Sequence, residues 1–417
     1  MGSIDTASTT LIRRGTPEYR RVNLALFIAG FVTFSTLYDF QPLMPVVARD
    51  FGVTPAAGSL TLSAATLALA ITLPVSGTLS DLLGRRRMMI ASVLLTSLLA
   101  LASAWCPSMH TLLAARLLQG VVLAGVPAVA MAYLGDEVEQ ASISAAMGLY
   151  ISGNALGGMT GRMLTALLAD FLPWRGAVAG IGGLSLVLAL LFVLLIPPSR
   201  NFRPRAFHPL ELTRSLLRQL REPGLLCLYA VAFCSMGAFV TLYNYSTFRL
   251  LAPPYSLSQG AASLIFASYL LGMFGSSWMG ALAGRIGRSR VLFAAQGGMA
   301  AAALLTLLEP LAAVALGIGL FTLAYFGAHA VASAWVGTRA GAGRAQASSL
   351  YLFSYYLGSS VLGTGGGFLW SWRGWSGVTM LILALVGCAF AAACRLALLE
   401  AAGERAPAAA AVCGAAE

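Results

Sequence analysis

Long apolar stretches recur along the whole chain and leave room for little except membrane-spanning helices. About 20 consecutive apolar residues cross a bilayer as an α-helix, because a helix satisfies its own backbone polar groups in lipid. The composition agrees: 58% of the 417 residues are hydrophobic, only 10% are charged, and the mean hydropathy is +0.81, which excludes an ordinary soluble domain. The sequence predicts an all-α integral membrane protein with twelve spans, at 22–48, 57–80, 88–106, 110–134, 141–168, 174–197, 223–250, 259–283, 290–309, 311–335, 345–369 and 374–398.

A loop motif that occurs twice divides the chain into two related halves. GTLSDLLGRRR at 77–87 joins two predicted spans, and GALAGRIGRSR at 280–290 joins two others half a chain later. Shorter echoes keep the same order: LPWRGA and WSWRGW precede the last span of each half, and LYDF and LYNY lie in the first. Bundles duplicated in this way usually transport solutes by rocking one half against the other. We therefore expect a gating role for the loop residues Gly77, Asp81, Gly84, Arg85, Gly280, Gly287 and Arg288.

The spans and loops predict five consecutive segments. These are a cytoplasmic N-terminal tail at 1–21, a six-helix bundle at 22–197, a basic cytoplasmic linker at 198–222, a second, pseudo-symmetric six-helix bundle at 223–398 and a cytoplasmic C-terminal tail at 399–417. The linker is the long loop of the chain, and we expect an amphipathic surface helix within it, around Leu210–Leu220.

The positively charged residues are concentrated on one predicted side of the membrane. The net charge is +11, and the chain contains no lysine. With the N-terminus inside, arginines gather in the tails, the linker and the cytoplasmic loops, whereas the outer loops carry Arg49, Arg175, Arg249 and Arg373. The positive-inside rule then places both termini in the cytoplasm. We interpret the charge as a topology signal and a contact for anionic membrane lipid, not as a nucleic-acid footprint. The six cysteines lack metal-ligand spacing, so no metal site is expected.

Three charged residues, Asp39, Arg116 and Arg162, lie inside predicted spans, where each costs on the order of 3 kcal/mol by insertion scales. The second half is neutral at the corresponding positions, with Asn244 in place of Asp39. Desolvation favours a neutral carboxyl and a nearby arginine favours the charged form, a competition that suits a group taking up and releasing a proton. We expect these three residues to couple transport to protons. The alternative is a static ion pair between Asp39 and Arg116 that ties two helices together.

Two further sets of residues are expected to line the substrate cavity and to pack the spans against one another. Polar and aromatic groups in the central spans favour a moderately apolar, neutral or cationic substrate, and glycines at helical spacing allow close approach of a neighbouring helix. The candidates for the substrate cavity are Tyr38, Gln119, Tyr150, Asn154, Tyr243, Asn244, Tyr269, Tyr325, His329 and Tyr355. The candidates for helix packing are Gly153, Gly157, Gly158 and Gly161.

Several of these motifs resemble a known family. The loop at 77–87 resembles the signature between the second and third helices of the major facilitator superfamily. LLAARLLQGVVLAG at 112–125 resembles the fourth-helix signature of its drug:proton antiporter branch, with Arg116 and Gln119 in place. SGNALGGMTGR at 152–162 is similar to the glycine-rich fifth helix of those antiporters but lacks their proline. That form resembles a subgroup of bacterial inner-membrane exporters.

The resemblance implies a secondary transporter of the bacterial cytoplasmic membrane that exports a small organic molecule, drug-like or a metabolite, by proton antiport through alternating access. Its expected partners are that substrate, protons and membrane lipid. A single chain is expected to suffice, with the proton gradient as energy source and no cofactor. A proton-coupled importer of a small metabolite shares the fold and the buried charges and is the close alternative. A polytopic membrane enzyme is disfavoured, because the sequence shows neither a catalytic cluster nor metal spacing, and no phosphate-binding loop indicates direct use of ATP.

Overall fold

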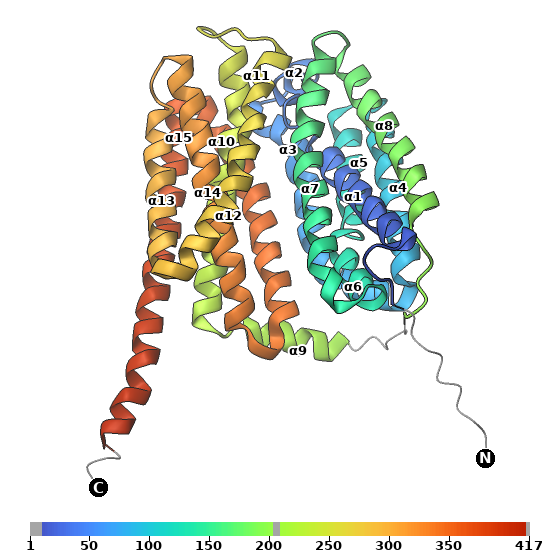
Figure 1. The fold of residues 1–417 in the computed structure, drawn as a ribbon. Helices are drawn as coiled ribbons and strands as arrows, with labels where there is room; N and C mark the ends of the chain where they lie inside the picture. The colour runs from blue at the N-terminus through green and yellow to red at the C-terminus, as the bar shows by residue number, and fades with distance from the viewer. Residues whose placement is uncertain (1–10, 203–208, 414–417) are drawn as a thin grey trace, which may run out of the picture. The chain divides into compact units, whose positions relative to one another are not determined.

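The computed structural model describes residues 11–202 and 209–413, and within them the chain is almost entirely α-helical (Figure 1). Each predicted span lies in one helix or in two or three consecutive helices, and the last two spans share one helix. The prediction of an all-helical membrane fold is therefore confirmed.

Helices of the first half follow the predicted spans, but two spans are interrupted. Span 22–48 breaks after Tyr38 because Pro42 has no backbone N–H for the Tyr38 carbonyl, which accepts instead from an N–H one residue earlier. Span 110–134 breaks before Pro127 for the same reason. The helices are α1 (Pro17–Tyr38), α2 (Met44–Asp50), α3 (Pro55–Leu83), α4 (Arg85–Ser103), α5 (Met109–Leu123), α6 (Pro127–Glu137), α7 (Gln140–Ala169) and α8 (Trp174–Leu195).

The second half begins with the helix expected in the linker, α9 (Pro209–Gln219). It continues with α10 (Pro223–Leu251), α11 (Gln259–Ser263), the 3₁₀ helix η1 (Leu264–Ser268), α12 (Tyr269–Ile286), α13 (Arg288–Leu305), α14 (Leu311–Arg339), the 3₁₀ helix η2 (Gly341–Gly343) and α15 (Arg344–Cys413). α15 holds the last two predicted spans, which separate at Arg373 and Gly374, where Gly374 adopts a φ of +60°. The helix then runs on to Cys413, so much of the predicted tail at 399–417 is helical.

Nine helical segments among the described residues are long and apolar enough to cross a membrane, judged by length and composition. One of these segments, Arg344–Ala402, contains the break at Arg373 and so includes two predicted spans. α7 and α13 match two further predicted spans but are not among the nine. The chain is thus a multi-pass membrane protein by the length and polarity of its helices.

Internal contacts divide the chain into two compact units, and one segment falls differently from the two predicted bundles. Unit 1 comprises Met1–Leu43 and Ile71–Phe207, and unit 2 comprises Met44–Ala70 and His208–Glu417. The first part of α3 therefore belongs to unit 2 and its last part to unit 1. The predicted bundles had placed all of α3 in the first half.

Segment 44–70 is held within unit 2 by hydroxyl groups. Thr364 Oγ1 donates to Ser63 Oγ at 2.8 Å, and Thr66 Oγ1 lies 2.7 Å from Ser360 Oγ. Small hydroxyl-bearing residues let membrane helices approach closely and bond to one another without burying an unpaired polar group. The contact between α3 and α15 is therefore polar as well as tight.

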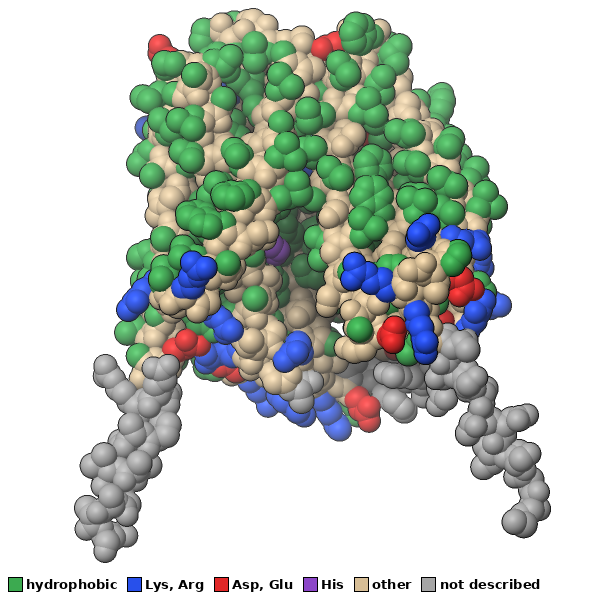
Figure 2. Space-filling model, in the orientation of Figure 1, with side chains coloured by type: hydrophobic (Ala, Val, Ile, Leu, Met, Phe, Trp, Pro, Cys, Tyr) green, Lys and Arg blue, Asp and Glu red, His purple; other side chains and the backbone are tan. Residues whose placement is uncertain are grey.

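Each unit has its own apolar core. Side chains on the visible surface are mostly hydrophobic, and arginines gather at one end of the helices of each unit (Figure 2). The core of unit 1 includes Tyr133 and Phe192, and it reaches Ile12 in the predicted N-terminal tail, which is only 7% exposed. An isolated β-bridge between Ile12 and Val138 fixes this segment at the end of α6.

Candidate functional site

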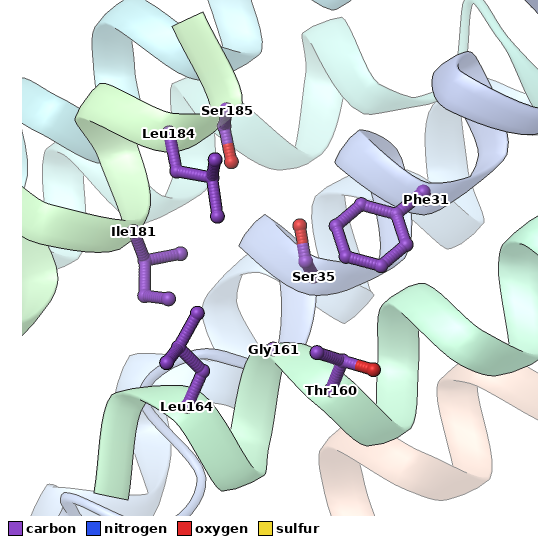
Figure 3. Close-up of a pocket in the computed structure, with 8 residues that line it drawn as sticks. All are labelled: Phe31, Ser35, Thr160, Gly161, Leu164, Ile181, Leu184 and Ser185. Carbon is purple, nitrogen blue, oxygen red and sulfur yellow. The ribbon is translucent and has the colours of Figure 1, made fainter. Parts of the chain in front are cut away.

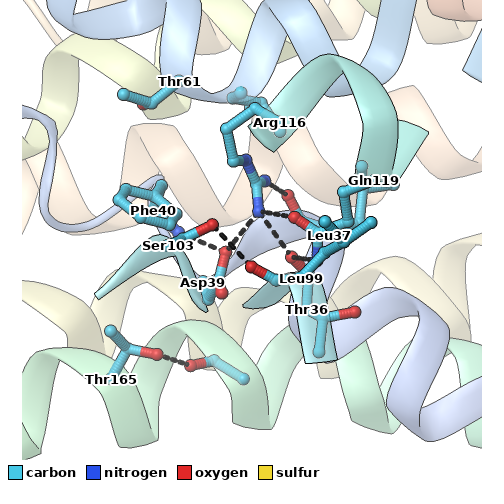
Figure 4. Close-up of polar contacts among 12 residues, drawn as sticks. Thr36, Leu37, Asp39, Phe40, Thr61, Leu99, Ser103, Arg116, Gln119 and Thr165 are labelled. Atoms are coloured by element: carbon cyan, nitrogen blue, oxygen red, sulfur yellow. Dashed lines mark hydrogen bonds and ion pairs between the residues drawn. The ribbon is translucent and has the colours of Figure 1, made fainter. Parts of the chain in front are cut away.

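A carboxylate at the end of α1 and an arginine of α5 lie together in the buried interior of unit 1 (Figure 4). Asp39 directly follows α1, Arg116 lies in α5, and both side chains are 0% exposed. Arg116 Nη1 lies 3.2 Å from Asp39 Oδ1. The backbone N–H of Phe40 donates to the same oxygen at 2.8 Å. The structure thus brings together two of the three charged residues that lie in predicted spans.

Arg116 also binds carbonyls that the end of α1 leaves without a helical partner. The last four carbonyls of a helix have no donor within it. Arg116 donates to the carbonyls of Thr36 at 3.0 Å and Leu37 at 2.7 Å, and to Gln119 Oε1 at 2.6 Å. Gln119 in turn donates to the carbonyl of Thr96 at 3.4 Å. Gln119, a candidate for the substrate cavity, therefore supports the ion pair.

The two oxygens of Asp39 have different surroundings. Oδ1 accepts hydrogen bonds from Arg116 and Phe40, whereas Oδ2 is buried without a hydrogen-bond donor among the described residues. A buried carboxylate oxygen without a donor is costly, because it has lost water and gained no partner. A proton can therefore bind at Oδ2 without displacing an existing hydrogen bond.

Arg162 holds the same turn of the chain from α7. Its Nε donates to Gln41 Oε1 at 2.5 Å, and its Nη1 donates to the carbonyl of Gly158, one of the predicted packing glycines. The guanidinium carbon lies 3.7 Å from the centre of the Tyr38 ring, a cation–π contact. Tyr38 is 5% exposed and packs beneath the arginine. Two buried arginines therefore hold the end of α1: Arg116 binds Asp39, and Arg162 binds Tyr38 and Gln41 on either side of it.

The other packing glycines bring α7 against the backbone of α1. A Cβ at Gly157 would lie 2.6 Å from Phe31 Cα, and a Cβ at Gly161 would lie 2.5 Å from Ser35 Cα, whereas ordinary contacts are 3.4–4 Å. Gly153 makes the same close approach one turn earlier. Any larger side chain at these positions would push the two helices apart.

A cavity of about 10 Å³ lies at this contact, at the lower limit for a single water molecule. Figure 3 shows the Ser35 hydroxyl and the Phe31 ring on one side of it and the side chains of α8 on the other. The cavity is lined by Phe31, Ser35, Thr160, Gly161, Leu164, Ile181, Leu184 and Ser185. Its volume fits a packing void between helices and excludes an organic substrate.

The first copy of the loop motif carries a network of charges. Arg85 Nη1 lies 2.7 Å from Asp81 Oδ1 and donates to Ser80 Oγ at 2.6 Å. Its Nε donates to Asp136 Oδ2, at the end of α6, at 3.1 Å. Two of the predicted gating residues, Asp81 and Arg85, are thus in contact, and a second acid joins them from another helix.

A glycine with positive φ directly precedes the helix that begins within each copy of the motif. Gly84 and Gly287 have φ angles of +91° and +97°, a region that side chains with a Cβ rarely adopt. Gly77 and Gly280, the other glycines shared by the copies, lie within helices with no atom within 4 Å of a Cβ. The structure therefore requires glycine at one position of each copy and tolerates other residues at the second.

The second copy is bonded differently. Arg288 donates to Thr338 Oγ1 at 2.7 Å. At the end of the same helix, α14, Arg339 lies 2.9 Å from Glu222 and 3.2 Å from Glu400. Burial opposes ionisation of Glu222, but hydrogen bonds from Arg339 and from backbone N–H groups outweigh it and hold the pKa of that carboxyl below its ordinary value. Sequence reasoning missed this cluster, because its members are far apart in the chain and show no spacing pattern.

Most of the aromatic candidates in unit 2 form a closed cluster. Tyr325 stacks on Phe239, with ring centres 3.9 Å apart, and Tyr269 meets the same ring edge-on at 5.7 Å. Tyr243 stacks on Phe266 and meets Phe239 at a tilt, and Asn244 beside it is fully buried. All four candidates are buried in this structure, and Tyr325 also lines a small cavity beside His329.

His329 and Tyr355 differ from them because both are partly exposed. Their ring centres are 4.9 Å apart, and His329 Nδ1 lies 3.0 Å from the hydroxyl of Tyr351. A second cavity of about 10 Å³ lies beside them and also touches Ser235. Tyr351 and Ser235 were not among the sequence candidates, because a buried tyrosine and serine in a span give no distinguishing pattern.

The two α7 candidates for the cavity have separate positions. Tyr150 is 4% exposed and belongs to the core of unit 1. Asn154 is partly exposed and packs against Gly30 of α1.

Comparisons with known proteins agree with one another. A family model described as Major Facilitator Superfamily matches residues 24–251. The uncharacterized MFS-type transporter YybF of Bacillus subtilis (strain 168) is 48% identical over 373 residues, which cover 89% of this chain and 92% of that protein. The inner membrane transport protein YnfM of Escherichia coli (strain K12) is 44% identical, covering 90% and 91%. A more distant match is the multi-drug resistance efflux pump PmrA of Streptococcus pneumoniae, 25% identical over 65% of this chain and 69% of its own.

A solved structure shares the fold. It is a bacterial homolog of the human lysosomal transporter Spinster in an inward-facing, unoccupied conformation. The TM-score is 0.75 and the sequence identity 16%, and the match covers 92% of this chain and 97% of that one. At this identity the likeness concerns the fold alone.

Proposed function

This chain belongs to the major facilitator superfamily and is a multi-pass membrane transporter; from that premise we propose that it exports a small organic molecule in exchange for protons by alternating access. The observation that carries the proton step is the unequal bonding of Asp39. One carboxylate oxygen is held by Arg116, and the other is buried without a donor among the described residues. Both termini face the cytoplasm in this proposal, following the distribution of arginines.

Protonation of Asp39 would loosen the ion pair without leaving Arg116 unsatisfied. A neutral carboxyl no longer forms an ion pair with a guanidinium, and the single hydrogen bond that remains is weaker than a bond between two opposite charges. The carbonyls of Thr36 and Leu37 would still accept from Arg116. The end of α1 could then shift relative to α5 at small cost and return when the proton leaves. Proton occupancy and the position of α1 are coupled in this way.

Substrate binding is assigned to the partly exposed aromatic groups of unit 2, chiefly His329 and Tyr355. Aromatic rings with a few hydrogen-bonding groups and no fixed charge suit a moderately apolar, neutral or cationic molecule. Export is the favoured direction for two reasons: the antiporter-like signatures in the sequence, and the similarity to PmrA, which is named a multi-drug efflux pump.

The test compares Asp39→Asn with the wild type and with Asp170→Asn in proteoliposomes. Asp170 is the exposed residue that follows α7, so the control makes the same acid-to-amide change away from the ion pair. A pH gradient should drive transport of fluorescent organic cations, ethidium among them, by the wild type and by Asp170→Asn. Asp39→Asn should lose this gradient-driven transport and keep exchange of the same cations down their own gradient.

Folding of the variant is measured beside its transport. Asparagine keeps the volume and one accepting oxygen for Arg116 and Phe40, but it removes the negative charge that pairs with the buried Arg116, so Asp39→Asn should cost about 3–5 kcal/mol of stability. Undiminished gradient-driven transport by a folded Asp39→Asn protein would contradict the proton role. Gradient-driven accumulation in the direction of proton flow would replace export with import.

A further inference from the structure

The linker helix α9 is attached to unit 2 by one side and is exposed on the other. Gln219 is 7% exposed, and its side chain lies against Gly343 in η2. Three leucines that point away from this contact are 61%, 50% and 40% exposed: Leu210, Leu217 and Leu220. We call these three residues the leucine stripe. Large apolar side chains that are exposed together on one side of a helix indicate a surface that binds another molecule or a membrane.

A row of arginines runs beside the leucine stripe. At 100° per residue the three leucines fall within about 80° of the helix circumference, and Arg214, Arg218 and Arg221 occupy the next 60° or so. The helical turn continues past α9, because the N–H of Arg221 donates to the carbonyl of Arg218. All three arginines, the arginine stripe, are exposed. Glu211 is the acidic residue of α9 and lies beyond them. The exposed side of α9 is thus half apolar and half strongly basic.

The place of α9 in the chain puts this face at the boundary of a membrane. Only three residues, Leu220–Glu222, separate α9 from α10, which is long and apolar enough to span a bilayer. α9 lies crosswise to the long helices of unit 2 (Figure 1). Its stripes therefore sit at the level where α10 enters the apolar layer.

We propose that α9 binds anionic phospholipid: the leucine stripe inserts among the upper acyl chains and the arginine stripe binds headgroup phosphates. Amphipathic helices with leucine on one face and arginine beside it lie in the membrane interface in this way. Guanidinium groups bind phosphate oxygens through paired, charge-assisted hydrogen bonds. Each arginine near an anionic surface raises the bound population about fivefold. The inference does not depend on the substrate, the direction of transport or proton coupling.

Charge argues against one other occupant of this face, and the exposed leucines argue against another. A second copy of the chain would present the same three arginines and, with a net charge of +11, would be repelled. A nucleic acid would use the arginine stripe but would leave the leucine stripe in water. A lipid surface satisfies both stripes at once.

The experiment measures amide hydrogen exchange of residues 209–221 in the full chain, one copy per nanodisc. The discs contain either phosphatidylcholine alone or a mixture with phosphatidylglycerol. The arginine variant is Arg214→Gln, Arg218→Gln and Arg221→Gln together, and the leucine variant is Leu210→Ser, Leu217→Ser and Leu220→Ser together. The matched control removes three exposed arginines elsewhere: Arg13→Gln, Arg14→Gln and Arg20→Gln. Exchange in α14 reports whether unit 2 remains folded.

In the wild type and the control, phosphatidylglycerol should slow exchange of 209–221 about tenfold. The arginine variant should exchange equally in both lipids, and the leucine variant should exchange rapidly in both, with α14 unchanged. Equal exchange of the wild type in the two lipids would overturn the proposal, as would protection that survives both sets of substitutions. Protection that appears only when discs hold two or more copies would assign the face to a second chain instead.

Discussion

Replacing Gly157 with alanine should weaken the packing of α7 on α1, whereas the same change at Gly148 should not. Both glycines lie inside α7, so alanine brings each the same gain in helix propensity, up to about 1 kcal/mol. At Gly157 the new Cβ would lie 2.6 Å from Phe31 Cα, while at Gly148 no atom lies within 4 Å. The pair of variants therefore differs in steric contact alone.

The size of the effect follows from the geometry. Ordinary contact begins at 3.4 Å, and the Phe31 carbonyl oxygen lies still nearer to this Cβ than Phe31 Cα does, so α1 and α7 must separate locally by more than about 0.8 Å to admit the methyl group at Gly157. The neighbour is backbone, which cannot rotate aside as a side chain does. Overpacking of a rigid contact costs about 1–3 kcal/mol. Because the propensity gain cancels, Gly157→Ala should be less stable than Gly148→Ala by about that amount.

The assay is reversible unfolding in mixed micelles titrated with a denaturing detergent, followed by circular dichroism. Gly157→Ala should unfold at a lower detergent fraction than Gly148→Ala, which should match or exceed the wild type. Equal stability of the two variants would refute the inference that α1 and α7 touch backbone to backbone at Gly157.

Two further predictions concern the loops. Gly84→Ala should lower the unfolding free energy by about 1–3 kcal/mol, because φ is +91° there, whereas Gly77→Ala, in an open helical position, should be neutral or slightly stabilising in the same titration. Glu222→Gln should remove a contribution to stability that exists above the ordinary carboxyl pKa of 4.5 and disappears as the pH falls through the lower pKa of the folded state. Melting temperatures of Glu222→Gln and the wild type should therefore differ at neutral pH and converge in acid; a constant gap would contradict the ion pair with Arg339.

The fold could be predicted because lipid imposes a simple rule on the backbone. A span must be helical and about 20 residues long, so apolar length alone located α10 at 223–250, where the structure has Pro223–Leu251. Pro42 and Pro45 predict a kink in the first span, but the break before Pro127 was missed, since prolines are tolerated within membrane helices when other groups bond to the freed carbonyls. Those groups, such as Arg116 at the end of α1, are contributed by other helices and leave no local pattern.

From the sequence, the candidate site could be predicted only at residues whose charge is unfavourable in lipid. Asp39 and Arg116 stand out as charges in apolar spans, and few partners exist for either, so their contact could be anticipated. Tyr243 and Tyr325 do not stand out, because a tyrosine in a span can equally belong to a cavity or to a core. Arg339 was missed because it lies at a helix end, where arginine is ordinary.

Pro74 lies close to the point at which α3 passes from unit 2 to unit 1. Pro74 lies inside α3 and has no N–H for the carbonyl of Ala70, the residue at which unit 2 gives way to unit 1. The helix thus lacks one rung of its hydrogen-bond ladder at the boundary. If the units change position during transport, α3 can bend at Pro74 without breaking another backbone hydrogen bond. If α3 did not bend at Pro74, segment 44–70 would have to separate from α15 and lose its hydroxyl hydrogen bonds. The stiffness of α3 at Pro74 would therefore determine how many of these hydrogen bonds break in each transport cycle.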